Sequence, residues 1–192
     1  VHLALNAILN QDKKIVQVLA GDPVAVMRAA IPISRDICQV AVSEKYGLMI
    51  TSPGGHPKDI NIYQAQKGLA HAARVTHPGG TIILAAACPE GTGSPHYEDW
   101  ALGKESYDDV IEQFKAEGFQ IGPHKAFQIA RDADQFRLMF CSEMDEELTR
   151  ALLLNPVKDL QTAVNVALAD LQPGDRIGVL PHAASTIPTI RA

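Results

Sequence analysis

Short apolar runs alternate with longer helical patterns along the chain, and proline and glycine punctuate the boundaries. Runs such as Leu48–Thr51 and Thr81–Ala85 are brief, aliphatic and flanked by turn residues, which is typical of buried strands. Further strands are expected at residues 2–9, 15–20, 37–42, 137–142 and 176–180, and helices near 59–74, 97–102, 107–117, 124–135 and 157–171. This alternation predicts an α/β fold class: a three-layer domain with a mostly parallel, doubly wound sheet.

Local turn chemistry adds detail near the N-terminus and before the strand at Thr81. The polar segment 10–13 separates the first two strands, which could therefore form a hairpin. Asp22 followed by Pro23 predicts a helix with the aspartate as its N-cap and the proline in its first turn. Pro78-Gly79-Gly80 is expected to be a turn.

Composition and charge exclude several classes of partner. The 192 residues carry 17 Lys and Arg against 22 Asp and Glu, a net charge of −5 without a basic block, so a nucleic-acid partner is not expected. No apolar run approaches the ~18 residues of a spanning helix, so no membrane partner is expected either. The three cysteines are widely spaced in or beside apolar segments, which predicts buried reduced thiols and a cytoplasmic protein.

The start of the chain also carries information. The chain begins at Val1 already inside an apolar run, with no initiator methionine and no signal peptide. We interpret the sequence as a piece of a longer protein, and expect it to be catalytically silent by itself.

Three loops are predicted to lie where ligands bind. In open parallel sheets, ligands sit beyond the carboxyl ends of the strands at a topological switch point. Segments 52–58, 88–94 and 181–186 each follow a predicted strand, so we expect them at the functional edge.

The segment from 52 to 71 contains the most specific pattern. Gly54-Gly55 matches neither a Walker loop nor a dinucleotide fingerprint, so a plain strand-to-helix turn is one interpretation. The helix that follows places apolar residues on one face, namely Ile62, Ala65, Leu69 and Ala73, and polar residues on the other, namely Tyr63, Gln64, Lys67 and His71. The polar stripe could hold a small oxygen-rich anion, or it could be a solvated outer face.

Residues 54–67 read Gly-Gly-His-Pro-Lys-Asp-Ile-Asn-Ile-Tyr-Gln-Ala-Gln-Lys and strongly resemble a signature of the nickel-dependent lactate racemase family, in its C-terminal domain. Segments 20–22, 88–91 and 180–188 are also similar to that family. The resemblance therefore extends over nearly the whole chain, and implies that residues 1–192 form the C-terminal domain of a two-domain protein.

The resemblance implies an activity for the parent protein. Members of the family racemise or epimerise 2-hydroxy acids by proton transfer and reversible hydride transfer, using a nickel-pincer nucleotide. The base histidines, the tethering lysine and the nickel-ligating histidine belong to the N-terminal domain, for which this sequence has no counterpart. We therefore expect no catalytic base, no metal ligand and no bound cofactor in this chain. Its expected partners are its own N-terminal domain and a small 2-hydroxy acid.

The same resemblance assigns substrate contacts. It implies that Lys67 pairs with the substrate carboxylate, while Gln64 and Tyr63 orient the molecule. The Gly54-Gly55 loop is a candidate cofactor contact. His56 occupies a variable position of the signature, and is either a cleft residue or an ordinary loop residue.

One departure from the family concerns the substrate. Lactate racemases place a tryptophan over the active site just before a helix, and that place falls on residues 124–127, whereas Trp100 lies elsewhere. The exchange implies a different 2-hydroxy acid. His124 or Lys125 could meet a larger or more acidic substrate, and Phe127 could simply belong to the core.

Other interpretations remain open. The chain could be a stand-alone α/β module that binds an anionic metabolite or nucleotide at Gly54-Gly55, or a structural domain without chemistry. Glu90 could line the cleft or cap a helix. Cys88 could be a nucleophile, although no histidine and acid partner can be assigned to it from sequence.

Overall fold

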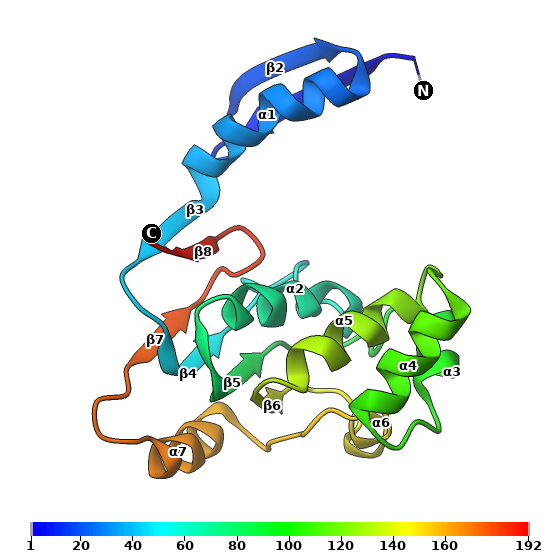
Figure 1. Cartoon of the computed structure of the whole chain (residues 1–192), viewed down its shortest axis with the longest axis vertical. Coiled ribbons are helices and arrows are strands. Elements are labelled where there is room, and N and C mark those ends of the chain that lie inside the picture. The colour runs from blue at the N-terminus through cyan, green and yellow to red at the C-terminus, as the bar shows by residue number, and fades with distance from the viewer. Residues whose placement is uncertain (1, 192) are drawn as a thin grey trace. The chain divides into compact units, whose positions relative to one another are not determined.

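The computed structural model describes residues 2–191 and divides into two compact units, Val1–Ala41 and Val42–Ala192 (Figure 1). We describe each unit by itself. None of the helices in this described range is long and apolar enough to cross a membrane.

The first unit is a hairpin and one helix. Strands β1 (Ala4–Leu9) and β2 (Ile15–Gly21) pair in antiparallel fashion, as the polar turn predicts. Helix α1 (Pro23–Cys38) begins at the predicted cap, where the Asp22 carboxylate accepts hydrogen bonds from two backbone N–H groups. The strand expected from residue 37 begins later, because α1 continues to Cys38; β3 spans Gln39–Val42.

The second unit contains a parallel sheet with the order β6-β5-β4-β7. Its strands are β4 (Tyr46–Thr51), β5 (Thr76–Ala85), β6 (Arg137–Cys141) and β7 (Ile177–Leu180), and each neighbouring pair is parallel. The chain adds strands in one direction from β4 to β6 and then returns to place β7 on the other side of β4. This is the doubly wound arrangement, and its switch point lies between β4 and β7.

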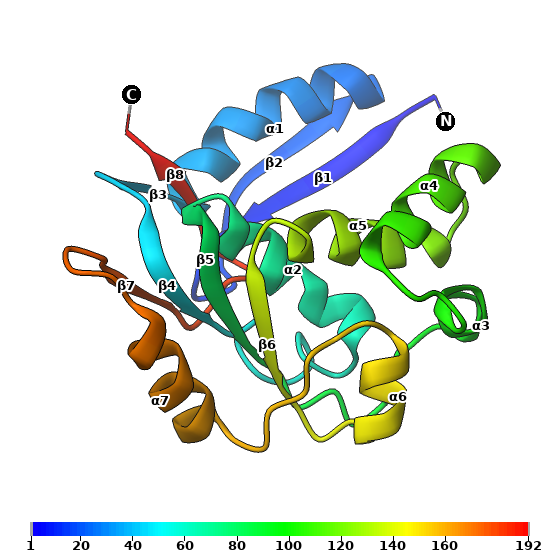
Figure 2. The same ribbon diagram turned by 60° about the horizontal axis from the view of Figure 1, so that its bottom comes forward.

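Helices cover both faces of this sheet (Figure 2). Helix α2 (Ile62–Ala73) packs on β4 and β5 and also contacts α5 (Pro123–Ala133), while α7 (Leu160–Asp170) packs on the opposite face. Helices α3 (Pro95–Ala101) and α4 (Tyr107–Glu117) pack on α5, and α6 (Glu146–Ala151) precedes α7. The α2 face holds the larger apolar cluster, so most of the core lies between α2, α5 and the sheet.

Several predicted boundaries are wrong for identifiable reasons. Pro78-Gly79-Gly80 is not a turn before a strand; it lies inside β5, where the register with β4 is irregular and the extra residues bulge. Helix α2 starts at Ile62 because Asn61 is its N-cap. Helix α7 starts at Leu160 rather than at 157, because Asp159 caps it. The short strand β8 (Ile187–Ile190) was not predicted.

Candidate functional site

The loops after β4 and β7 meet at the switch point of the sheet. The Ser52 N–H donates to the Leu180 carbonyl over 3.0 Å, and the Ala183 N–H donates to the Ser52 carbonyl over 2.9 Å. A third bond, 3.1 Å long, joins the Ala184 N–H to the Pro53 carbonyl. Two of the three predicted edge loops are therefore held together by the backbone itself.

Gly54 lies close to the loop after β7. Its φ is +112°, and a Cβ at this position would lie 3.1 Å from Nδ1 of His182. A side chain would thus meet both an unfavourable backbone conformation and a close neighbour. Gly55 also has a positive φ, of +73°, but open space beyond it. The sequence predicted the 181–186 loop at this edge without assigning a role to His182, which follows a predicted strand and lies in a segment that resembles the racemase family.

The third edge loop packs against the start of α2. The Cys88 N–H donates to the Asp59 carbonyl over 2.8 Å, and the Ile62 N–H donates to the Gly91 carbonyl over 3.0 Å. The next helical N–H groups, of Tyr63 and Gln64, donate to the Thr92 carbonyl and to the Asn61 side chain. Because these N–H groups already have acceptors within the chain, recognition of a ligand here depends on side chains rather than on the helix N-terminus.

The polar stripe of α2 has the predicted composition but is not a fully solvated face. Ile62, Ala65 and Leu69 are buried on the core side, whereas Lys67 is exposed and Tyr63, Gln64 and His71 are half-buried. Lys67 Nζ donates to Oε1 of Gln64 over 2.8 Å, which fixes the amide and the ammonium together. His71 Nδ1 forms a hydrogen bond with the Ala183 carbonyl, so the stripe is anchored to the loop after β7.

The first turn of α5 joins this stripe. The His124 ring meets the Tyr63 ring edge-on, with centroids 5.7 Å apart. Lys125 Nζ lies 4.9 Å from the centroid of the Tyr63 ring and donates to Oε1 of Gln66 over 3.3 Å. The structure therefore brings together Tyr63, Gln64, Lys67, His124 and Lys125, all predicted from sequence, and adds Gln66, which was not.

This cluster carries a net positive charge. Burial, assisted by the charge of Lys67, lowers the pKa of Lys125 below its ordinary value. Neither lysine forms an ion pair with a carboxylate among residues 2–191. An aromatic face, amide groups and two ammonium groups suit a small anion that carries oxygen atoms.

His56 and Phe127 lie outside the cluster. His56 is exposed, and none of the contacts found in residues 2–191 connects it with the α2 stripe. Phe127 stacks on Phe114 with centroids 4.7 Å apart, which agrees with a packing role.

The structure also bears on the two residues left open in the 88–94 loop. Burial, together with the charge of Asp59, raises the pKa of Cys88 to about 12, which opposes a nucleophilic role. Glu90 is exposed and does not cap the next helix, because Ser94 is the N-cap of α3.

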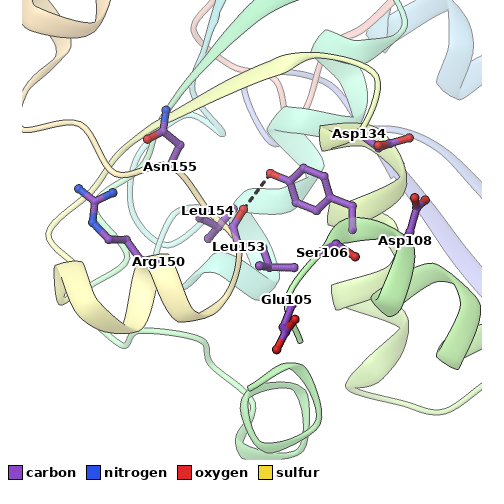
Figure 3. Close-up of a pocket in the computed structure, with 9 residues that line it drawn as sticks. Glu105, Ser106, Asp108, Asp134, Arg150, Leu153, Leu154 and Asn155 are labelled. Carbon is purple, nitrogen blue, oxygen red and sulfur yellow. Dashed lines mark hydrogen bonds between the residues drawn. The ribbon is translucent and has the colours of Figure 1, made fainter. Parts of the chain in front are cut away.

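A separate hollow of about 490 Å³ lies between α4, α5 and α6 (Figure 3). Its acidic side chains are Glu105, Asp108 and Asp134, and Tyr107 donates a 2.8 Å hydrogen bond to the Leu153 carbonyl beside it. The basic residue that lines it, Arg150, already pairs with Glu146. None of the predicted site residues lines this hollow, and its charge does not suit an anion.

A nickel ion would need donor groups that the described chain does not gather. Within residues 2–191, no group of three or more His, Cys, Asp or Glu side chains could hold a metal ion. The residues present therefore do not fit a resident metal.

Comparisons with known proteins agree with the fold. The lactate racemase of Thermoanaerobacterium thermosaccharolyticum is 27% identical over 187 residues, which cover 95% of this chain and 44% of that protein. The lactate racemase of Lactiplantibacillus plantarum is 26% identical over 197 residues, with the same two shares. The chain thus spans less than half the length of these relatives.

Solved structures give the same result in three dimensions. The lactate racemase apoprotein of Thermoanaerobacterium thermosaccharolyticum matches 100% of this chain and 46% of its own, with a TM-score of 0.87 and 26% identity. A protein from Thermotoga maritima, 14% identical, shares the fold over 98% of this chain and 49% of its own, with a TM-score of 0.68. Residues 42–188, nearly all of the second unit, match the Lactate racemase C-terminal domain, and the chain therefore belongs to that family.

Proposed function

We propose that residues 1–192 are the cleft-closing, substrate-binding half of a two-domain racemase or epimerase of 2-hydroxy acids. The observation that carries this proposal is the cluster of Tyr63, Gln64 and Lys67 beside the start of α5, in a chain of the lactate racemase family. The parent protein would use the nickel-pincer nucleotide implied by that family, held by residues outside this chain. We also propose a cytoplasmic location, which agrees with the free thiols of all three cysteines.

The proposed role of the cluster is to bind and orient the substrate. The Lys67 ammonium is exposed and would pair with the carboxylate. Gln64, whose Oε1 already accepts from Lys67, retains its NH₂ group to donate to a carboxylate or hydroxyl oxygen. The half-buried Tyr63 ring would limit the directions in which the substrate can lie. Such positioning can lower a barrier by several kcal/mol when the reacting groups are held close together.

The Gly54-Gly55 loop is the proposed point of approach for the cofactor. A Cβ added at Gly55 would meet no heavy atom within 4 Å, so the backbone is open to approach there, and His182 lies close to Gly54.

The proposal is tested by changing Lys67 in the full two-domain protein, loaded with cofactor. Lys67→Ala should lower kcat/KM for chiral 2-hydroxy acids by about 100-fold or more, since the carboxylate loses its charged partner. Lys115→Ala on α4 is the matched control, because Lys115 is exposed and outside the cluster. Normal turnover by Lys67→Ala would disprove the proposed pairing of Lys67 with the substrate carboxylate. Failure of the loaded protein to racemise any 2-hydroxy acid would disprove the reaction.

The alternative is a stand-alone module that binds an anionic metabolite or nucleotide at Gly54-Gly55. The positive φ of both glycines favours a close backbone approach there, but the neighbouring helical N–H groups already have acceptors. Calorimetry of the 192-residue chain against nucleotides and 2-hydroxy acids separates the two functions. Micromolar binding of a nucleotide by this chain alone would favour the module.

A further inference from the structure

Lys125 is a buried lysine without an acidic partner. Its exposed fraction is 8%, and no carboxylate among residues 2–191 pairs with it. Lysine is rarely buried unless its charge is compensated, because removing an ammonium group from water is costly. A surface lysine ordinarily extends into solvent. Lys67, which lies one helical turn after Tyr63 in α2, does so.

The groups that surround Lys125 hold it in place without neutralising it. Oε1 of Gln66 and Oε1 of Gln128 accept hydrogen bonds from Nζ over 3.3 and 3.2 Å. The face of the Tyr63 ring lies 4.9 Å away, and Lys67 contributes a second positive charge. Amide dipoles and an aromatic face orient an ammonium group, but only an anion offsets its charge.

Lys67 and Lys125 are therefore two neighbouring cations, and each is held by its own amide partners. Lys67 is held by Gln64, within α2, and Lys125 by Gln66 and Gln128, between α2 and α5. If Lys67 pairs with the carboxylate beside the hydroxyl-bearing carbon, Lys125 remains without a counter-ion. A second acidic group on the substrate would supply one.

We propose that the substrate of this site is a 2-hydroxy dicarboxylic acid, whose distal carboxylate binds Lys125 while its proximal carboxylate binds Lys67. This inference rests on the proposed function and adds the substrate class to it. The Tyr63 ring, which contacts the side chains of both His124 and Lys125, lies against the carbon chain between the two carboxylates.

The test compares two acids with the same number of carbon atoms, malate and 2-hydroxybutyrate, in the cofactor-loaded two-domain protein. The wild-type protein should prefer malate by at least about tenfold in kcat/KM. Lys125→Met keeps the length and apolar stem of the side chain, and should lower the malate to 2-hydroxybutyrate ratio of kcat/KM by about 10- to 100-fold. Lys115→Met is the matched control and should leave the ratio unchanged.

A preference for 2-hydroxybutyrate, or a ratio that Lys125→Met does not change, overturns the dicarboxylate inference and leaves the racemase proposal standing. If neither acid is racemised, the racemase proposal fails. The dicarboxylate inference is then tested by the binding of the two acids to the protein. NMR of the protein with labelled lysine should then show that malate, and not 2-hydroxybutyrate, raises the pKa of Lys125. Equal effects of the two acids on Lys125 would overturn it.

Discussion

The two compact units follow similar local rules but differ in what they can bury. In the first unit, the buried apolar residues are Ile8, Val26 and Ala30, whereas Leu3, Leu5, Val18 and Met27 are among its many exposed apolar side chains. In the second unit, helices on both faces of a parallel sheet enclose two apolar clusters. Regular strands and helices therefore form in both units, but within residues 2–191 only the layered unit has a core of its own.

The largest expected effect comes from separating the units. Residues 42–192 expressed alone should retain a cooperative thermal unfolding transition, because both clusters lie inside that range. Residues 1–41 alone should show no such transition, since so short a chain buries too little apolar surface to offset its conformational entropy. Circular dichroism melts and NMR spectra of the two peptides test this. A folded 1–41 peptide would remove the distinction between the units.

Thiol reactivity sharpens the same comparison. Burial and the charge of Asp59 raise the pKa of Cys88 from 9.0 to about 12, whereas Cys38 in the first unit is half-buried. At pH 8, alkylation of Cys88 should be about 1,000-fold slower than that of an ordinary exposed thiol, because only the thiolate reacts. Cys38 should react first. Mass spectrometry after timed treatment with iodoacetamide measures both rates, with Cys88→Ala to assign the slow site.

The raised pKa also sets the sign of a pH effect on stability. Between pH 9 and 12, an unfolded chain loses the Cys88 proton before the folded chain does, so this thiol makes the fold less stable as the pH rises through that window. Cys88→Ala should weaken this alkaline loss. Rapid alkylation of Cys88 in the folded protein at pH 8 would contradict the burial on which both expectations depend.

The smallest expected effect is the change in unfolding free energy when a leucine of each unit is replaced by alanine. Leu69 in α2 is 1% exposed, so Leu69→Ala should lower the free energy of unfolding by about 3 kcal/mol through lost burial and a cavity. Leu5 in β1 is 76% exposed, and Leu5→Ala should change it by less than about 0.5 kcal/mol. Urea melts of the two variants measure the difference. Equal losses would show that the first unit buries Leu5 in solution.

Local chemistry allowed the ends of several elements to be predicted. The boundaries of α4 agree because Ser106 caps its start and Gly118 follows its end, and Asp22 and Pro23 mark the start of α1. The α2 stripe was predictable because one helix sets its spacing. These features depend on residues only a few positions apart.

The features that were missed depend on distant residues. Pro78-Gly79-Gly80 reads as a turn, but Thr76 before it and Thr81 after it both pair with β4, so β5 extends through it. Nothing in the sequence indicates that Lys125 donates a hydrogen bond to Gln66, which lies 59 positions earlier. The approach of His182 to Gly54 depends on the placement of β7 beside β4. Such pairings arise from the packing of the whole unit, and no local pattern encodes them.

The junction between the loops after β4 and β7 has a consequence for the order of folding. Thr51 and Leu180, which share a hydrogen bond at this junction, lie 129 positions apart. Contacts of such sequence separation form slowly, because a long loop must close before they contribute any stability. During synthesis, the α2 stripe is made well before the segment that anchors it through His71. The proposed substrate-binding surface should therefore be among the last parts of the unit to become ordered, after the helix that carries it has already formed.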